Sequence, residues 1–332
     1  MYTNFLSFLL IISFFLGCSN HVKIKALKPA EIDRATSTKN IAVVAFDNDR
    51  VGLSSKIESN LAGFRLDNKA FFTIVSRSDL NQLISEQKLQ NSGLVDTKNI
   101  VEVGELIGAQ AIISGNVGRP TLSDSHFYEK RMRCADKKCK DIYYVSVGCT
   151  SRVVSLSAEL KMVDVSRGDI IYADNLSRSS TFKHCRDDSQ TLPSKESAAQ
   201  NLAMSIANSF TYKLTPHYRY VHVEFLEDPD LDYTDSQEDL LKHALEYMKL
   251  NRYDKAAELL EKLVDATDQQ SYVAFYNLGV VKEAQGDYAK AKMYYEKAES
   301  LTLKPVEAVS IAYNRINAAI DEHNLTKMQM NR

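Results

Sequence analysis

The spacing of apolar residues changes twice along this chain, and each spacing allows a different kind of structure. Residues 40–117 alternate short apolar runs, such as IAVVAF, with segments whose apolar residues recur every three or four positions. Residues 150–180 alternate apolar and polar side chains singly, and residues 240–320 keep the helical spacing alone. The first two patterns predict a sheet flanked by helices, and the third predicts an all-helical domain. With 332 residues, the chain is long enough for both cores.

Residues 39–223 are expected to form the α/β (α+β) domain, with a mixed sheet flanked by helices. Ile41 to Phe46 is an uninterrupted apolar run bounded by Asn40 and Asp47, which is typical of a strand buried on both faces. Ser166-Arg167-Gly168 predicts the turn of a hairpin. The other expected elements are helices at 53–64, 78–89, 98–107 and 194–214, and strands at 70–76 and 108–117. The last helix is expected to bury Ala198, Leu202, Met204, Ile206 and Phe210.

An apolar run, LSFLLIISFFLG, precedes Cys18. Its twelve residues are too few for a membrane-spanning helix, which needs ~20, but they fit the apolar core of a signal peptide. Gly17-Cys18 resembles a bacterial lipobox, in which the cysteine is acylated and becomes the new N-terminus. We expect a signal peptide at 1–17, a lipid on Cys18, a tether at 18–38 and a location on the periplasmic side of the outer membrane. An ordinary secretory signal and an uncleaved anchor are the alternatives.

Four cysteines remain besides the lipidation candidate. They are Cys134, Cys139, Cys149 and Cys185. An even number of cysteines in an exported protein predicts two disulfides, with three connectivities open. A metal site is the alternative because His184 adjoins Cys185, although the Cys-x4-Cys spacing is loose for structural zinc.

The helical part of the chain repeats itself. AFYNLGVVKEAQGDYAKAKMYYEKA ends at Ala298, and similar residues stand 35 positions earlier, from Ala244 onward. This pattern is similar to the tetratricopeptide repeat, whose small residues let two helices of a hairpin approach closely. The expected segments are an acidic linker at 224–239, repeats with a capping helix at 240–322, and a tail at 323–332.

Tetratricopeptide grooves bind partners on the inner helix faces. At these positions the partner-binding candidates are Leu241, Leu245, Met248, Tyr276, Val280 and Glu283. Packing within the chain is the alternative role for them.

Several ordered blocks resemble the CsgG family of envelope lipoproteins. They are IAVVAFDN, IVSRSDLNQLISEQKLQNSGLVD, ELIGAQAIISGNV and LSAELKMVDVSRGDIIYA, and the match covers about residues 39–215. The sharpest part is Ser76-Arg77-x-Asp79-Leu80 followed by Glu86-Gln87. The family includes the curli secretion lipoprotein, and penicillin-binding-protein activator lipoproteins share its fold. The resemblance therefore implies a role in the cell envelope.

The sequence offers no argument for an enzyme or a cofactor. It has no phosphate loop, no Gly-x-Ser-x-Gly elbow and no His-Glu-x-x-His helix. The net charge of -2 gives no basic field for nucleic acid. One basic loop is a candidate site for an anionic partner, such as a lipid head group or an acidic protein face, or is simply solvated. Its residues are Lys130, Arg131, Arg133, Lys137, Lys138 and Lys140.

Channel-forming members of the family donate two amphipathic hairpins per subunit to a membrane pore. The matching insertions here are residues 119–149 and 179–193. The first carries charges on both faces and alternates well only at Tyr143, Val145 and Val147, and the second is short and polar. The sequence therefore favours a non-enzymatic, membrane-tethered adaptor that binds envelope proteins. A subunit of an oligomeric secretion channel is the alternative.

Overall fold

The computed structural model describes residues 20–75, 101 and 104–332. The expected signal peptide with Cys18, the helix at 78–89 and the motif from Ser76 to Gln87 lie outside these residues. The chain divides into two compact units. Among the described residues, the sheet unit contains those within 27–217 and 324–332, and the helical unit contains 20–26 and 218–323.

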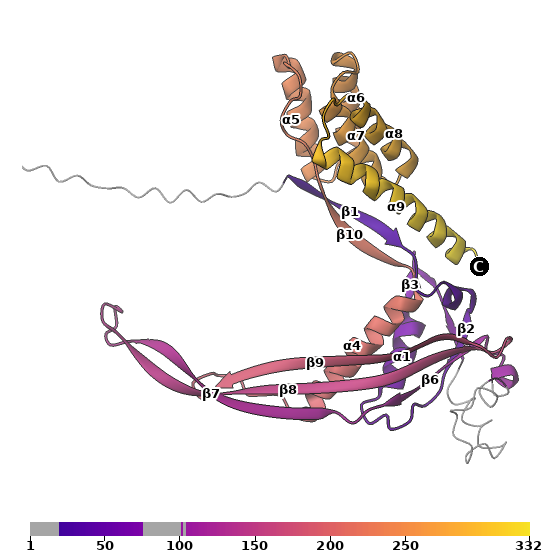
Figure 1. Ribbon diagram of the computed structural model, residues 1–332, viewed down its shortest axis with the longest axis vertical. Coiled ribbons are helices and arrows are strands. Elements are labelled where there is room, and N and C mark those ends of the chain that lie inside the picture. The colour runs from indigo at the N-terminus through magenta and orange to yellow at the C-terminus, as the bar shows by residue number, and fades with distance from the viewer. Residues whose placement is uncertain (1–19, 76–100, 102–103) are drawn as a thin grey trace, which may run out of the picture. The chain divides into compact units, whose positions relative to one another are not determined.

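A six-stranded mixed sheet organises the sheet unit (Figure 1). Its strands run in the order β5-β2-β6-β8-β7, and β9 pairs with β8. β2 is parallel to β5 and β6, and the other pairs are antiparallel. The strands are β2 (Asn40–Val43), β5 (Thr73–Ile74), β6 (Ala111–Val117), β7 (Thr121–Cys134), β8 (Ile142–Asp164) and β9 (Ile170–Cys185). Outside the sheet, β3 (Arg65–Leu66) pairs with β4 (Lys69–Ala70), and a 3-10 helix spans Asp33–Ser37.

Strand β2 is buried on both faces, as its apolar run predicts. Ile41 and Val43 pack in one core with helices α1 (Leu53–Gly63) and α4 (Lys195–Leu214), whereas Ala42 and Val44 pack in a second core on the opposite face. Figure 1 shows α1 and α4 on the same side of the sheet. This layering confirms the expected fold class.

Helix α4 begins at its N-cap Ser194, whose side chain accepts a hydrogen bond from the Ser197 backbone N–H. Leu202, Ile206 and Phe210 are buried as expected, but Met204 is 41% exposed. The expectation for Met204 is wrong because it lies two residues from both Leu202 and Ile206, which places it on the opposite side of the helix.

Five helices form most of the helical unit. They are α5 (Asp235–Lys249), α6 (Tyr253–Ala266), α7 (Tyr272–Ala284), α8 (Tyr288–Ser300) and α9 (Glu307–Met330). The expected tail at 323–332 is wrong, since α9 continues to Met330. Within the sheet unit, the buried amide of Gln329 donates to the Ala30 carbonyl and accepts from the Ala30 N–H.

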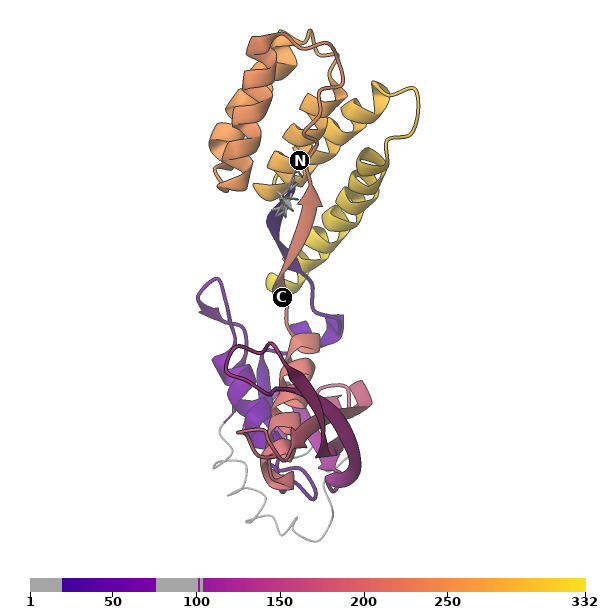
Figure 2. The same cartoon turned by 90° about the vertical axis from the view of Figure 1, so that its left-hand side faces the viewer.

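The expected tether is also wrong. Residues His21–Lys28 form β1, which pairs with β10 (His217–Glu224) in a two-stranded ribbon. Val22 and Ile24 of β1 and Val223 of β10 join the core of the helical unit, and Figure 2 shows the ribbon beside the helices. The sequence HVKIKALK carries the period-two alternation of a strand with one buried face.

The expected acidic linker is partly folded. α5 begins at Asp235, with Thr234 and Gln237 forming a capping box. The Asp230 carboxylate accepts hydrogen bonds from the Ser271 hydroxyl and the Tyr272 backbone N–H at 2.6 Å each. This carboxylate therefore fixes the segment to the start of α7.

Candidate functional site

The end of the β7–β8 hairpin, residues 127–148, forms an arm that extends beyond α4 (Figure 1). β7 pairs with β8 without interruption from Thr121–Ser155 to Cys134–Ile142. β9 ends at Cys185, opposite Cys149, so among the named strands residues 142–148 of β8 pair only with β7. The arm is thus a two-stranded hairpin, and neither of its faces is covered by a third strand among those named.

Two disulfides brace the arm. Cys134 bonds to Cys139 at its tip, and Cys149 bonds to Cys185 at its base. This is one of the three connectivities that the sequence leaves open. The Glu129 carboxylate lies close enough to Cys149 and Cys185 for these three side chains to be a candidate metal group, but both sulfurs are committed to the disulfide.

One face of the arm is partly covered by ion pairs, and we call it the paired face. Arg131 Nη1 lies 2.8 Å from carboxylate oxygens of both Asp187 and Asp188, and Arg133 pairs with Asp187. The hydrogen bond from Arg131 is the main reason that the pKa of Asp188 lies below its ordinary value. These pairs hold the segment after β9 over the paired face.

The opposite face, which we call the open face, carries large exposed apolar side chains. Tyr128 is 78% exposed, Met132 55%, Ile142 49% and Tyr144 65%, with the exposed Lys130 between Tyr128 and Met132. The register places all five on one face, because Met132 is opposite Tyr144 and Cys134 is opposite Ile142. Sequence reasoning missed this face, although the alternation of YEKRM already separates Tyr128, Lys130 and Met132 from Glu129 and Arg131.

The charged side chains of the basic loop are distributed over the paired face, the open face and the tip of the arm. Its two arginines are the ones that pair on the paired face. Within the described part of the chain, no ion pair is found for its lysines, which are Lys130, Lys137, Lys138 and Lys140. Asp136 accepts hydrogen bonds from the backbone N–H groups of Lys138 and Lys140, so it shapes the tip and leaves their ammonium groups exposed.

The structure buries all six groove candidates within the helical unit, which argues against their direct contact with a partner. Their exposed fractions lie between 0% and 6%, and the set is Leu241, Leu245, Met248, Tyr276, Val280 and Glu283. Five of them belong to one apolar core. This core also contains Val22, Ile24 and Val223 of the β1–β10 ribbon, and Phe225, which follows β10. The sixth, Glu283, accepts two hydrogen bonds from Arg315 and one from Tyr295.

The chain's own segment from Glu224 to Leu226 lies on α7. The Tyr276 hydroxyl donates to the Glu224 carbonyl at 2.8 Å, and burial raises the pKa of Tyr276 to about 12. The Asn277 amide pairs with both backbone polar groups of Leu226. On the helix face that carries Tyr276, the occupant is thus a segment of the chain itself, which is the alternative role expected from the sequence.

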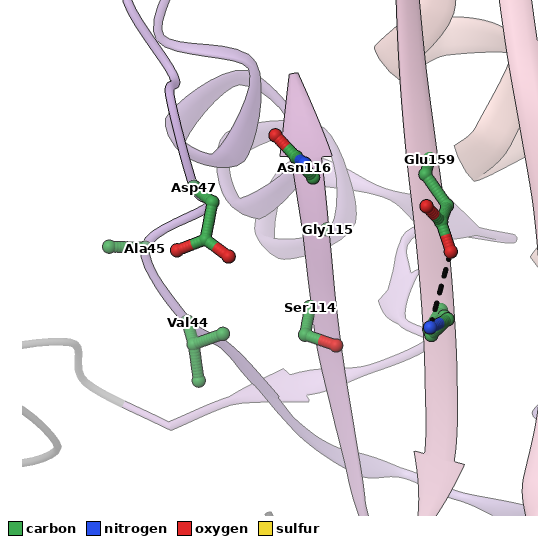
Figure 3. A pocket seen from close by; sticks show the side chains of 8 residues that line it. Val44, Ala45, Asp47, Ser114, Gly115, Asn116 and Glu159 are labelled. Atoms are coloured by element: carbon green, nitrogen blue, oxygen red, sulfur yellow. Dashed lines mark ion pairs between the residues drawn. The ribbon is translucent and has the colours of Figure 1, made fainter. Parts of the chain in front are cut away.

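A small hollow of about 110 Å³ lies between the residues that follow β2 and the strands β6 and β8 (Figure 3). Asp47, Ser114 and Asn116 line it, and Glu159 pairs with Lys161 at 3.2 Å. Ser114 is the only hydroxyl among the lining residues, and they include no histidine or cysteine.

No helix among the described residues is both long enough and apolar enough to span a bilayer.

Two family models match the chain. Residues 32–184 match the curli production assembly/transport component CsgG, and residues 240–270 and 272–305 match the tetratricopeptide repeat. Both resemblances expected from the sequence are thereby confirmed. No curated protein matches the sequence.

Several solved structures match at low identity, among them the following three. Lipoprotein GNA1162 from Neisseria meningitidis is 12% identical (TM-score 0.26), and the match covers 52% of this chain and 98% of that one. Hypothetical protein CT253 from Chlamydia trachomatis is 12% identical (TM-score 0.21), with 43% and 72% covered. The PelC dodecamer from Paraburkholderia phytofirmans is 16% identical (TM-score 0.22), with 59% and 99% covered. Such low TM-scores lend no weight to any particular role.

Proposed function

We propose that this chain, which carries a CsgG-family domain followed by tetratricopeptide repeats, is a non-enzymatic, lipid-anchored adaptor of the cell envelope. It is held through Cys18 on the periplasmic side of the outer membrane and binds a protein of envelope assembly or export. The lipobox-like Gly17-Cys18 after a short apolar run supports the anchor.

The open face of the arm carries this proposal. Tyrosine and methionine are enriched in protein interfaces, and here they stand exposed on a hairpin braced by disulfides. The ion pairs of Arg131 and Arg133 cover part of the paired face, where Tyr143 stays exposed, so the open face offers the larger apolar surface to a partner.

The charges of the arm define the partner's chemistry. Lys130 stands within the open face, and Lys137, Lys138 and Lys140 surround the tip. A complementary surface is a protein face with an apolar centre and an acidic rim. The six groove candidates are mostly buried, so we assign partner binding to the arm.

The family matches support the non-enzymatic part of this proposal. The CsgG and tetratricopeptide families are generally non-catalytic.

Photo-crosslinking in cells tests the adaptor role. A benzophenone amino acid at Tyr144, on the open face, is expected to capture a protein with an acidic surface. The matched control is the next residue, Val145, which is half-buried on the paired face and is expected to give little adduct. Equal capture from both positions, or capture of lipid alone from Tyr144, contradicts the proposal.

A subunit of an oligomeric secretion channel is the second candidate. The length of the β7–β8 hairpin favours it, since β7 alone has 14 residues and ~9–11 are enough for a strand to cross a bilayer. The number of copies in the assembly separates the two candidates.

A further inference from the structure

The outer face of the β1–β10 ribbon combines lysines with tyrosines. Lys23 and Lys25 of β1 are exposed, and their ammonium groups lie 4.2 and 3.7 Å from the ring centroids of Tyr220 and Tyr218. Tyr220 is 56% exposed. The alternate side chains of the ribbon are buried in the core of the helical unit, so the ribbon is fixed with this face outward.

The start of the ribbon is held by hydrogen bonds at Asn20, two residues after the expected lipidation site Cys18. The Asn20 amide donates to the Glu224 carboxylate at 2.8 Å, and the Phe225 N–H donates to the Asn20 carbonyl at 2.8 Å. In the sequence, only Ser19 separates Asn20 from Cys18. Two residues span at most about 7 Å, because an extended chain advances roughly 3.3–3.6 Å per residue.

A lipid on Cys18 would therefore have no flexible tether. Acyl chains in the bilayer would hold the beginning of the ribbon at the level of the phospholipid head groups. Tyrosine rings and lysine side chains are the groups that favour this level, since the ring sits among the head groups and the ammonium reaches phosphate. The Glu224 carboxylate at this end of the ribbon already accepts a hydrogen bond from Asn20.

We propose that the Lys23, Lys25, Tyr218 and Tyr220 face is a membrane-contact surface that lies against anionic phospholipid head groups and fixes the orientation of the helical unit. This inference rests on the proposed lipid anchor at Cys18. It goes beyond that anchor, because a lipid on Cys18 alone does not determine which face of the helical unit lies toward the bilayer.

The first experiment does not depend on lipidation. Residues 18–332 carrying Cys18→Ser are mixed with vesicles of phosphatidylcholine alone, or of equal parts phosphatidylcholine and phosphatidylglycerol, and sedimented. Binding to the anionic vesicles alone is expected. Each basic residue near an anionic surface contributes about 1 kcal/mol, so Lys23→Gln with Lys25→Gln is expected to weaken binding about 30-fold.

The matched control removes two exposed lysines from elsewhere in the helical unit. Lys242→Gln with Lys304→Gln makes the same change in net charge and is expected to leave binding within about twofold of the parent, since the two sites are outside the ribbon. Equal losses in the two double variants, or no anionic binding by the parent, overturn the inference.

The second experiment uses the lipidated chain in vesicles. The sequence contains no tryptophan, so Tyr220→Trp introduces a single fluorophore. Quenching by lipids brominated near the head group is expected for Trp at 220 but not for Met293→Trp on α8, where the parent side chain is 50% exposed. Co-sedimentation without quenching at 220 overturns the contact surface and leaves the anchor intact. Failure of Cys18 to gain the mass of a lipid overturns the anchor itself.

Discussion

Asn277 holds Leu226 by both of its backbone polar groups. The side-chain Nδ2 donates to the Leu226 carbonyl at 2.8 Å, and Oδ1 accepts from the Leu226 N–H at 2.9 Å. Asn277 is fully buried on α7, so these hydrogen bonds are shielded from water. An extended stretch of the chain thereby occupies the helix face on which the sequence predicts a partner.

Asn277→Ala is expected to loosen this stretch. The substitution leaves the Leu226 N–H and carbonyl without their partner, which costs about 1–3 kcal/mol of unfolding free energy. Hydrogen exchange should quicken at Leu226 and its neighbours. Gln285→Ala, at the exposed C-cap of the same helix, is the control and should leave this exchange unchanged. Unaltered exchange in Asn277→Ala would show that apolar packing alone holds the segment.

Gly279→Ala tests the close approach of α7 and α8. A Cβ atom at Gly279 would lie 2.6 Å from Tyr295 Cε1, and the Tyr295 ring is fully buried with its hydroxyl donating to Glu283. The ring cannot move without breaking that hydrogen bond, so we expect a loss of about 1–3 kcal/mol in urea unfolding. Gly63→Ala, where no atom lies within 4 Å of the new Cβ, is the control. Equal stability of the two variants would contradict the packing described here.

Much of the fold is predictable because it is encoded in local periodicity. The run from Ile41 to Val44 contains no polar position, so both faces of β2 must be buried. β1 shows the limit of this reasoning. Its alternation is equally clear, but a strand needs a partner. That partner, β10 (His217–Glu224), lies almost two hundred residues away in the sequence.

The candidate site was less predictable for a similar reason. A count of charges in the basic loop treats Lys130 and Arg131 alike. The register of β7 against β8 places them on opposite faces, and only Arg131 meets the aspartates that follow β9. Which charges are neutralised depends on a segment more than fifty residues away, which composition does not reveal.

The ion pairs of the paired face should be visible in the titration of Asp188. Its folded pKa is lowered, first by the hydrogen bond from Arg131 and then by the Cys185 N–H. The stabilising effect is therefore present above the ordinary aspartate pKa and is lost as pH falls through the lowered folded value. Arg131→Gln is expected to raise the pKa of Asp188 toward its ordinary value in a carbon-13 NMR titration.

Lys130→Gln is the matched control for this titration, because the neighbouring residue removes the same charge from the open face. It should leave the Asp188 pKa nearly unchanged. Equal shifts in the two variants would mean that the general field of the arm, and not the Arg131 contact, sets this pKa.

The two disulfides should contribute unequally to stability. Cys149–Cys185 closes a separation of 36 residues, and Cys134–Cys139 closes only 5. In the chain-entropy account, their replacement by serine pairs costs about 4 and about 2 kcal/mol respectively. Urea unfolding of the two double variants checks this order. Thiol labelling of the unreduced, denatured chain should find none of these four cysteines free, whereas thiols that appear only after chelation would favour the metal alternative.

The number of copies decides between adaptor and channel. The open face carries Lys130 between Tyr128 and Met132, and a lysine facing lipid at the bilayer midplane costs ~2–4 kcal/mol. We therefore expect the lipidated protein to be a monomer or dimer by light scattering in mild detergent. The Cys18→Ser chain without detergent is the control, since it gives the mass of the protein without a micelle. A closed ring of many copies would favour the channel, and the open face would then be a contact between subunits or with lipid and not a docking site for an adaptor's partner.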